Sequence, residues 1–329
     1  MSRMLAVARE SWPIRGVFRI SRGARTEAEV VTVTISEGDT VGRGECVPYT
    51  RYGESIDSVI EQIQSVAEAI AGGMDRLALL DALPAGAARN AVDCALWDLE
   101  AKSKGVPAWK LAGLANAPEP VTTVYTLSVD TPDAMGAAAA ENAHRPRLKL
   151  KMTGDGEDLA RVTKIRENAP GVDLVVDANE AWTIDSYLEI APKLAELGVS
   201  MIEQPLPAGD DAALIGVPRA TAVCADESCH DTATLDGLEG KYDMINIKLD
   251  KTGGLTEALR LKAEAEKRGF RVMVGCMIGT SLAMAPGMIV SQGAELVDLD
   301  APLLLAKDRD PCMTYNGSTV MPPDAALWG

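Results

Sequence analysis

Histidine, phenylalanine and basic residues are scarce in this 329-residue sequence. It contains two histidines, two phenylalanines, and 32 lysines and arginines against 48 aspartates and glutamates, which gives a net charge of −16. Because nucleic-acid backbones and anionic membranes attract basic surfaces, this balance argues against both as partners. With so few histidines, any acid–base chemistry is expected to fall to lysine, aspartate or glutamate.

The sequence also lacks a CxxC pair, a cysteine–histidine cluster and a long apolar run. Its six cysteines are scattered, so neither a zinc site nor a thioredoxin-type site is indicated, and we expect reduced cysteines in the core. No stretch approaches the roughly 18 apolar residues of a membrane span, and the first residues have too short an apolar run for a signal peptide. A cytoplasmic protein is the default expectation. The oligomeric state stays open, with a homo-oligomer among the options.

The first third of the chain predicts an α+β unit. We expect strands at 4–9 and 28–36, a turn-rich piece over 38–55, and helices at 55–72 and 87–104. The turn-rich piece contains a GxG pair. It lacks the third glycine and the following helix of a dinucleotide-binding loop, so no such cofactor is expected.

From about residue 121, short apolar runs alternate with amphipathic stretches. Eight such runs recur about every 25 residues, at 121–129, 148–152, 174–176, 201–202, 222–225, 244–247, 272–274 and 296–299. Strands separated by helix-sized gaps are typical of βαβ units, and eight units favour a (β/α)8-type barrel. A doubly wound open sheet, which shows the same local pattern, is the alternative.

Carboxylates follow three consecutive predicted strands of this barrel. Asp177, Glu203 and Asp226 are 26 and 23 residues apart, about one βα unit each. Because the carboxyl ends of parallel strands meet at one face of a barrel, the three side chains should converge. Oxygen ligands without histidine or cysteine suit a hard cation such as Mg²⁺. The alternative is three ordinary acidic loop residues.

Lysines end two further strands. Lys149 and Lys151 are two apart and so share the face towards the barrel interior, and Lys248 should face them from four strands further round. A free lysine has a pKa of about 10.4 and a useful base needs roughly 7–8. We expect desolvation, a neighbouring lysine and a cation to lower it. The alternative is that these lysines reach a solvated face and are structural.

Two bases on opposite sides of a metal define a reaction. One removes a proton from a carbon acid, the metal stabilises the enolate, and the other base returns a proton to the opposite face. Such a site inverts a stereocentre. Asp298 and Asp300 end the last predicted strand, two residues apart, and so share a face, which suits a ligand with a free ammonium.

With these residues the sequence resembles the dipeptide epimerases of the enolase superfamily, in its muconate-lactonising subgroup and nearest to the L-Ala-D/L-Glu epimerases. That superfamily uses a Lys or His base with Mg²⁺. The resemblance covers nearly the whole chain and weakens after about residue 303. Its segments are PYTRYGES, LPAGAARNAVDCALWDLEAK, VDANEAW, EQPLPAGDDAAL, CADESCH, INIKLDKTGGLTEAL, GCMIGTS and DLDAP.

The resemblance implies a fold, a cofactor and residue roles. The fold is a (β/α)7β-type TIM barrel over 119–303 with an α+β capping domain over 1–118, to which 304–329 contribute. The cofactor is one Mg²⁺ per subunit. The implied roles are acid/base for Lys151 and Lys248, enolate stabilisation for Lys149, metal binding for Asp177, Glu203 and Asp226, and substrate binding for Arg25, Thr126, Cys276, Met277, Asp298 and Asp300.

The implied activity is Mg²⁺-dependent epimerisation of L-Ala-D-Glu to L-Ala-L-Glu, and of other L-Ala-L-Xaa dipeptides, in the recycling of murein peptides. Another reaction of the superfamily, such as that of o-succinylbenzoate synthase or muconate cycloisomerase, is the alternative. The pair of Asp298 and Asp300 argues against it, because those substrates carry no ammonium. A catalytically inert binding protein on the same fold is the third hypothesis, since a fold does not imply a function.

Overall fold

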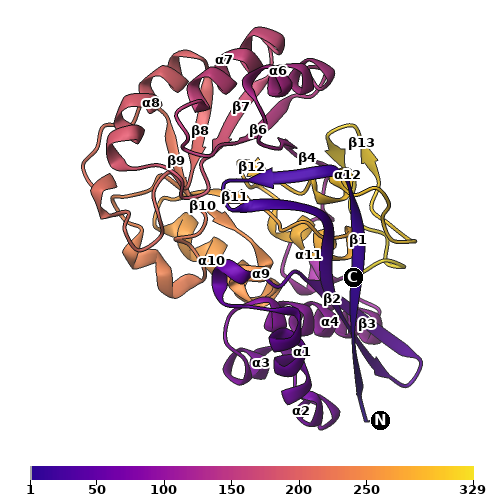
Figure 1. Cartoon of the computed structure of the whole chain (residues 1–329). Helices are drawn as coiled ribbons and strands as arrows, with labels where there is room; N and C mark the ends of the chain where they lie inside the picture. The colour runs from indigo at the N-terminus through magenta and orange to yellow at the C-terminus, as the bar shows by residue number, and fades with distance from the viewer. Residues whose placement is uncertain (1) are drawn as a thin grey trace.

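The chain begins with an antiparallel sheet built on a long hairpin. In the computed structural model, which describes residues 2–329, β1 (Met4–Ile20) pairs with β2 (Gly23–Glu37), and β2 pairs with β3 (Thr40–Cys46). The two predicted strands are confirmed but are longer than expected. The expectation of a turn-rich piece is wrong over β3. In Figure 1 the indigo β1–β2 hairpin reaches across to the eight-stranded sheet.

Helices cover one side of this small sheet. They are η1 (Thr50–Tyr52), α1 (Ile56–Ser65), α2 (Ala67–Ala71), α3 (Arg76–Ala82), α4 (Ala87–Lys104) and α5 (Ala108–Leu111). The helix predicted at 55–72 is interrupted at Val66, and the one predicted at 87–104 is confirmed as α4. Ser55 begins α1 with a capping box, and Gly105 ends α4 in a left-handed conformation with φ 63°.

The GxG pair explains how β3 packs. A Cβ atom added to Gly42 would lie 2.2 Å from the carbonyl oxygen of Ala95, and one added to Gly44 would lie 2.1 Å from that of Ala91. The two glycines therefore let the backbone of α4 lie directly on β3. Their role is packing rather than cofactor binding.

Eight parallel strands form the second sheet, which curls in Figure 1. In spatial order they follow the chain: β5 (Tyr125–Leu127), β6 (Arg147–Lys151), β7 (Asp173–Asp177), β8 (Val199–Glu203), β9 (Ala222–Ala225), β10 (Met244–Ile247), β11 (Arg271–Val274) and β12 (Leu296–Val297). A parallel bridge between Thr123 and Val297 links the two edges of this sheet. The α/β class with eight parallel strands is confirmed.

The connections between these strands are helical, but not all contain an α-helix. They contain α6 (Pro132–Glu141), α7 (Asp158–Asn168), α8 (Ile184–Glu196), η2 (Ala212–Leu214), η3 (Thr232–Gly237), α9 (Leu249–Thr252), α10 (Leu255–Lys267) and α11 (Ser281–Val290). The predicted helix-sized gaps are present after β8 and β9, but these two contain 3₁₀ turns instead of an α-helix. Prolines and glycines interrupt the segment after β8, and two glycines interrupt the one after β9, which disfavours a longer helix in either place.

The first predicted barrel strand, 121–129, is split between two sheets. β4 (Val121–Thr122) pairs with β14 (Thr319–Val320), which pairs with β13 (Tyr315–Asn316). After α12 (Ala301–Leu304) the chain thus returns to the start of the barrel and then to α4. There the Trp328 indole donates a hydrogen bond to the carbonyl of Cys94 over 3.0 Å, and Trp328 is buried.

Every second side chain of a parallel strand points into the curled sheet, so the inward side chains form successive layers. One apolar layer is formed by Val124, Val175, Met201, Cys224, Met244, Met273 and Leu296. Because side chains two residues apart share a face, the next inward positions on β7, β8 and β9 are Asp177, Glu203 and Asp226. The apolar layer closes the floor beneath a charged layer at the carboxyl ends of the strands.

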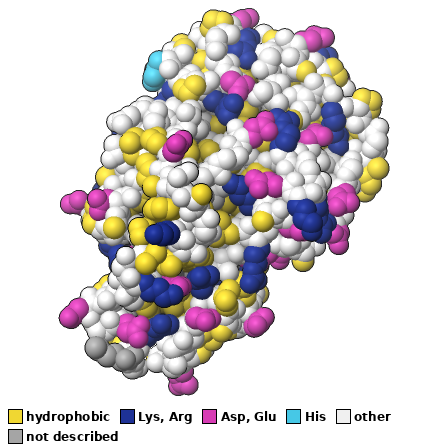
Figure 2. Space-filling model, turned by 180° about the vertical axis from the view of Figure 1, so that it is seen from behind, with side chains coloured by type: hydrophobic (Ala, Val, Ile, Leu, Met, Phe, Trp, Pro, Cys, Tyr) yellow, Lys and Arg dark blue, Asp and Glu magenta, His cyan; other side chains and the backbone are white. Residues whose placement is uncertain are grey.

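The surface mixes both signs of charge. Figure 2 shows acidic and basic side chains interspersed over one face. Four of the six free cysteines are buried as expected, whereas Cys312 is exposed. Each helix within residues 2–329 is too short or too polar to cross a lipid bilayer.

Candidate active site

Three buried carboxylates meet at the carboxyl end of the curled sheet. Asp177 ends β7, Glu203 ends β8 and Asp226 follows β9, and one oxygen of each lies within 4.8 Å of the others. Their exposed fractions are 0%, 0% and 2%. The convergence predicted from their spacing is therefore present in the structure.

The acidic group has the chemistry of a cation site. Burial and the nearby Asp177 carboxylate raise the pKa of Glu203 to about 7. Glu203 Oε2 is fully buried, and no group among residues 2–329 donates a hydrogen bond to it; Lys149 Nζ lies 2.7 Å away but out of hydrogen-bond alignment. An all-oxygen ligand set with an unsatisfied buried oxygen fits a hard divalent cation.

Two lysines contact this group from different strands. Lys151 Nζ on β6 lies 2.5 Å from Asp177 Oδ2, and Lys248 Nζ after β10 lies 2.6 Å from Asp226 Oδ2. Three strands separate β6 from β10 in the sheet. The two ammonium groups therefore approach the acidic group from its two flanks.

The third lysine lies deeper, between the acidic group and the last strand. Lys149 Nζ is 2.7 Å from both Asp298 Oδ2 and Glu203 Oε2, and 3.4 Å from Asp177 Oδ2. Its exposed fraction is 1%, so it sits beneath the cavity rather than on its wall.

The carboxylates shift the pKa values of Lys149 and Lys248 upwards. Burial lowers the pKa of Lys149, but Asp298, Glu203 and Asp177 outweigh burial and raise it. For Lys248 the Asp226 carboxylate likewise outweighs burial and raises the pKa. For Lys149 and Lys248 the direction is thus opposite to the expected lowering, because carboxylate oxygens that could hold a cation accept the lysine protons.

Asp300 lies beside Asp298 at the end of the last strand. The backbone N–H of Thr126 donates to Asp300 Oδ2 over 2.6 Å. Burial and the Asp298 carboxylate raise the pKa of Asp300 to about 7. Cys276 Sγ lies within 4.8 Å of a carboxylate oxygen of both aspartates. Thr126 thus holds Asp300 through its backbone and does not line the main cavity.

A cavity of about 370 Å³ opens above these groups. Its walls include Lys151, Lys248, Arg25, Cys276 and Met277, and the turn between β1 and β2 lies over it. This is within the size range of small-molecule sites. The predicted bases Lys151 and Lys248 and the acidic group thus lie together at this cavity. Of the predicted substrate-binding residues, Arg25, Cys276 and Met277 line the cavity, whereas the buried Thr126, Asp298 and Asp300 do not.

Comparison with models of protein families identifies the family to which the chain belongs. Residues 134–323 match the model described as enolase C-terminal domain-like, and residues 2–113 match the N-terminal domain of mandelate racemase and muconate lactonizing enzyme.

The chain belongs to the enolase superfamily.

Two relatives of this chain bear the names of isomerases. The L-Ala-D/L-Glu epimerase of Escherichia coli (strain K12) is 45% identical over 95% of this chain and 98% of its own length. An N-acetyl-D-glutamate racemase from a Pseudoalteromonas species is 44% identical over 91% of this chain and 95% of its own. The prediction of an isomerase is confirmed.

Solved structures give the same result. An enolase-family protein from Agrobacterium tumefaciens, solved with sodium and L-Ala-L-Glu, is 53% identical with a TM-score of 0.96, covering 99% of this chain and 100% of that one. A dipeptide epimerase from Enterococcus faecalis V583, solved with Mg and L-Leu-L-Tyr, is 28% identical with a TM-score of 0.89 and covers 98% of both chains. The resemblance to dipeptide epimerases is confirmed.

Sequence reasoning missed two buried residues of this enolase-superfamily site. Asn246 Nδ2 donates to Glu203 Oε1 over 2.7 Å, and Lys251 Nζ donates to Asp226 Oδ1 over 2.6 Å. Both could have been found, because Asn246 lies two residues before Lys248 on the same strand face and Lys251 lies one helical turn after it.

Proposed function

We propose that the chain is a dipeptide epimerase that interconverts L-Ala-D-Glu and L-Ala-L-Glu. The observation that carries this proposal is the placement of Lys151 and Lys248 on two flanks of one buried acidic group, with both side chains reaching the same cavity. Two bases on different sides of one carbon allow a proton to leave one face and another to enter the opposite face.

We propose one Mg²⁺ per subunit, held by Asp177, Glu203 and Asp226. The buried oxygen of Glu203 and the all-carboxylate donor set support this assignment. When bound, the ion supplies a Lewis acid that stabilises negative charge on a substrate carboxylate oxygen. With Asp177 and Asp226 engaged as ligands, their contacts with Lys151 and Lys248 would weaken, which favours the free amine of one lysine.

The proton transfers are assigned to the two flanking lysines. The free amine of one lysine takes the α-proton of the glutamyl residue, and the C–H electron pair moves into the enolate of its carboxylate. The ammonium of the other lysine then protonates the α-carbon from the opposite face. Lys149, with Asp298 and Glu203 each 2.7 Å from its Nζ, places a fixed positive charge where the enolate forms.

Charge complementarity supports the choice of substrate. Asp298 and Asp300 suit the α-ammonium of a dipeptide, and Thr126 positions Asp300. Arg25 in the cavity wall suits the side-chain carboxylate of glutamate, and Cys276 and Met277 complete the wall. An N-acetylated amino acid has no ammonium, which favours the dipeptide over the substrate named for the Pseudoalteromonas relative.

We propose a capping domain over 1–118 with 304–329, a catalytic (β/α)7β barrel over 119–303, and a role in murein-peptide recycling in the cytoplasm. Among solved relatives, binding of dipeptides other than L-Ala-L-Glu, such as L-Leu-L-Tyr, supports some breadth of substrate, including other L-Ala-L-Xaa dipeptides.

Deuterium exchange tests the proposed activity. The protein is incubated with Mg²⁺ and L-Ala-D-Glu in heavy water, and NMR follows deuterium at the glutamyl α-carbon and the appearance of L-Ala-L-Glu. N-acetyl-D-glutamate serves as the matched substrate without an ammonium. Faster turnover of the dipeptide supports the proposal. Preference for the N-acetyl compound, or no exchange with any dipeptide, would overturn it.

A further inference from the structure

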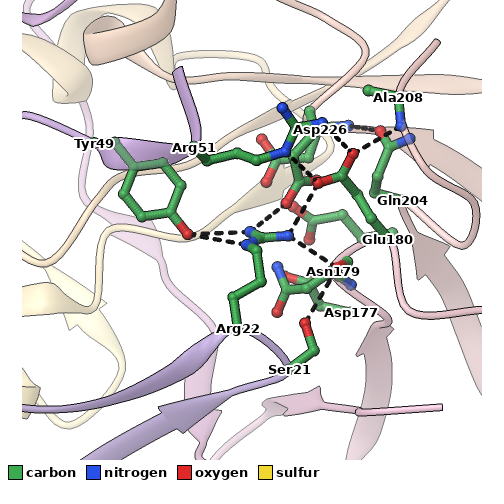
Figure 3. Close-up of polar contacts among 12 residues, drawn as sticks. Ser21, Arg22, Tyr49, Arg51, Asp177, Asn179, Glu180, Gln204, Ala208 and Asp226 are labelled. Atoms are coloured by element: carbon green, nitrogen blue, oxygen red, sulfur yellow. Dashed lines mark hydrogen bonds and ion pairs between the residues drawn. The ribbon is translucent and has the colours of Figure 1, made fainter. Parts of the chain in front are cut away.

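Contacts within the protein use all the hydrogen-bond donors of the Arg22 guanidinium. Its guanidinium donates from Nη2 to Glu227 Oε1 over 2.6 Å, from Nη1 to Glu180 Oε2 over 3.1 Å and to the Asn179 carbonyl over 2.9 Å, and from Nε and Nη2 to the Tyr49 hydroxyl. A guanidinium has five N–H donors, so none is left for a ligand. Figure 3 shows this side chain crossing from the β1–β2 turn to the ends of the parallel strands.

Arg25, three residues later, is the contrasting case. Within residues 2–329 its side chain makes no hydrogen bond or ion pair, and its guanidinium lies 5.6 Å from the centre of the Tyr49 ring. Both arginines line the cavity, but only Arg25 has donors available for a substrate. The two arginines of the SRGAR segment therefore have different roles.

Glu180 connects Arg22 with a second arginine. Arg51 donates to it through two hydrogen bonds, from Nε over 2.8 Å and from Nη2 over 2.7 Å, and the backbone N–H of Ala208 donates over 2.7 Å. The Glu180 side chain is 9% exposed. We call Arg22, Arg51, Glu180 and Glu227 the four-residue clamp. It joins the β1–β2 turn and η1 to the loops after β7 and β9, and Figure 3 labels Arg22, Arg51 and Glu180 of this group.

The backbone beneath the clamp is strained. Asn179 and Glu180 both have positive φ, at 45° and 68°, in the left-handed region that residues other than glycine seldom adopt. Such strain persists only where surrounding contacts hold it. Here the Glu180 N–H donates to the Gln204 carbonyl over 2.9 Å, and the Asn179 N–H donates to Asp177 Oδ1 over 2.9 Å. The strained pair therefore bonds directly to a carboxylate of the acidic group.

The other acidic residue of the clamp is equally close to that group. Glu227 is the residue after Asp226, and its side chain is 1% exposed. Each acidic member of the clamp thus lies within three residues of a proposed metal ligand, while each basic member comes from a segment over the cavity. The clamp therefore connects the segments over the cavity directly to the loops that carry Asp177 and Asp226.

We infer that the four-residue clamp couples closure of the β1–β2 turn over the cavity to the geometry of the metal site, with Glu180 as the positioning residue between them. The inference rests on the proposed function only in taking Asp177 and Asp226 as metal ligands. Opening the clamp releases the strained pair at Asn179 and Glu180 and lets the Asp177 carboxylate move. Arg25 remains free to bind the substrate, and Arg22 fixes the turn that carries Arg25.

Substitution of Glu180→Gln tests the coupling in the full chain. Mg²⁺ affinity is measured by calorimetry without substrate, and hydrogen–deuterium exchange by mass spectrometry over 17–25 and 48–53. We expect about tenfold weaker Mg²⁺ binding, as is usual when a group supporting a metal ligand is lost, together with faster exchange in both segments. With L-Ala-D-Glu, KM should rise and kcat fall.

The matched control is Glu29→Gln on the same hairpin, which removes an exposed ion pair with Arg9. It should leave Mg²⁺ affinity and exchange at 17–25 unchanged. Arg51→Lys keeps the charge but loses the two-pronged contact with Glu180, so it should show the same changes in smaller measure. This variant also keeps the test decisive if Glu180→Gln does not fold.

Wild-type Mg²⁺ affinity in both Glu180→Gln and Arg51→Lys would overturn the coupling. So would an equal loss in Glu29→Gln. A change in exchange without a change in Mg²⁺ affinity would reduce the clamp to a purely structural contact. Mg²⁺ affinity and hydrogen–deuterium exchange are both measured without a substrate. These outcomes are therefore independent of whether the protein epimerises dipeptides.

Discussion

Lys151 and Lys248 contact different carboxylates of the same acidic group, and this separation is the basis of the stereochemical proposal. Each lies within 2.6 Å of its own partner, Asp177 for the first and Asp226 for the second. Because each reaches the cavity from its own flank, loss of one leaves the other in place.

We therefore predict that Lys151→Ala and Lys248→Ala each reduce epimerisation by about 10²–10⁴-fold, the usual contribution of a positioned acid or base. Each variant should still exchange the α-proton of the one stereoisomer that faces the surviving lysine. NMR in heavy water, run separately on L-Ala-L-Glu and L-Ala-D-Glu, measures this. Epimerisation at the wild-type rate by either variant would contradict the two-base assignment.

Asp300 gives the site a dependence on pH. Burial and Asp298 raise its pKa to about 7, so the carboxylate becomes protonated and loses its charge as the pH falls below about 7. We predict that affinity for the ammonium of a dipeptide falls between pH 8 and pH 6, as measured by calorimetry with L-Ala-L-Glu. Asp300→Asn should bind weakly at both values. Equal wild-type affinity at pH 6 and pH 8 would exclude this role.

At the same scale, sequence reasoning identified residues whose partners follow from strand periodicity. Asp177, Glu203 and Asp226 recur with the βα repeat, so their convergence was predictable. The different roles of Arg22 and Arg25 were not, because the partners of Arg22 are Glu180 and Glu227, more than 150 residues further along the chain.

At the scale of elements, β3 shows how a local pattern can mislead. Its two glycines indicated a turn, yet the strand pairs with β2 over its whole length, from Thr40 to Cys46. The reason is tertiary: α4 lies so close that only glycine fits at Gly42 and Gly44. The partner helix begins more than 40 residues later, and its approach leaves no periodic signal within β3.

We predict that Gly44→Ala destabilises the protein by about 1–3 kcal/mol, the usual cost of forcing an extra carbon into a packed core. Its Cβ would lie 2.1 Å from the Ala91 oxygen and 2.9 Å from the Ala95 nitrogen. Gly171→Ala is the matched control, because its Cβ would have no neighbour within 4 Å and should change stability by less than about 0.5 kcal/mol. Urea unfolding followed by circular dichroism compares them. Equal stability of both variants would contradict the packing argument.

For the molecule as a whole, the repeat of strands predicted eight parallel strands in chain order, because each apolar run is short and bounded by polar segments. It did not predict that residues 121–129 divide between two sheets. That division depends on β14, which lies about 190 residues further on and pairs with β4, and on β13, which pairs with β14. Pairings this distant in sequence leave no local pattern to read.

The final segment has a consequence for how the chain is made. The indole of Trp328 packs against α4 and bonds to the Cys94 carbonyl, a contact that spans 234 residues. During synthesis on the ribosome, more than two hundred residues are therefore added after α4 before Trp328 can pack against it. A nascent chain that stops short of Trp328 keeps an apolar surface of α4 open to chaperones and proteases.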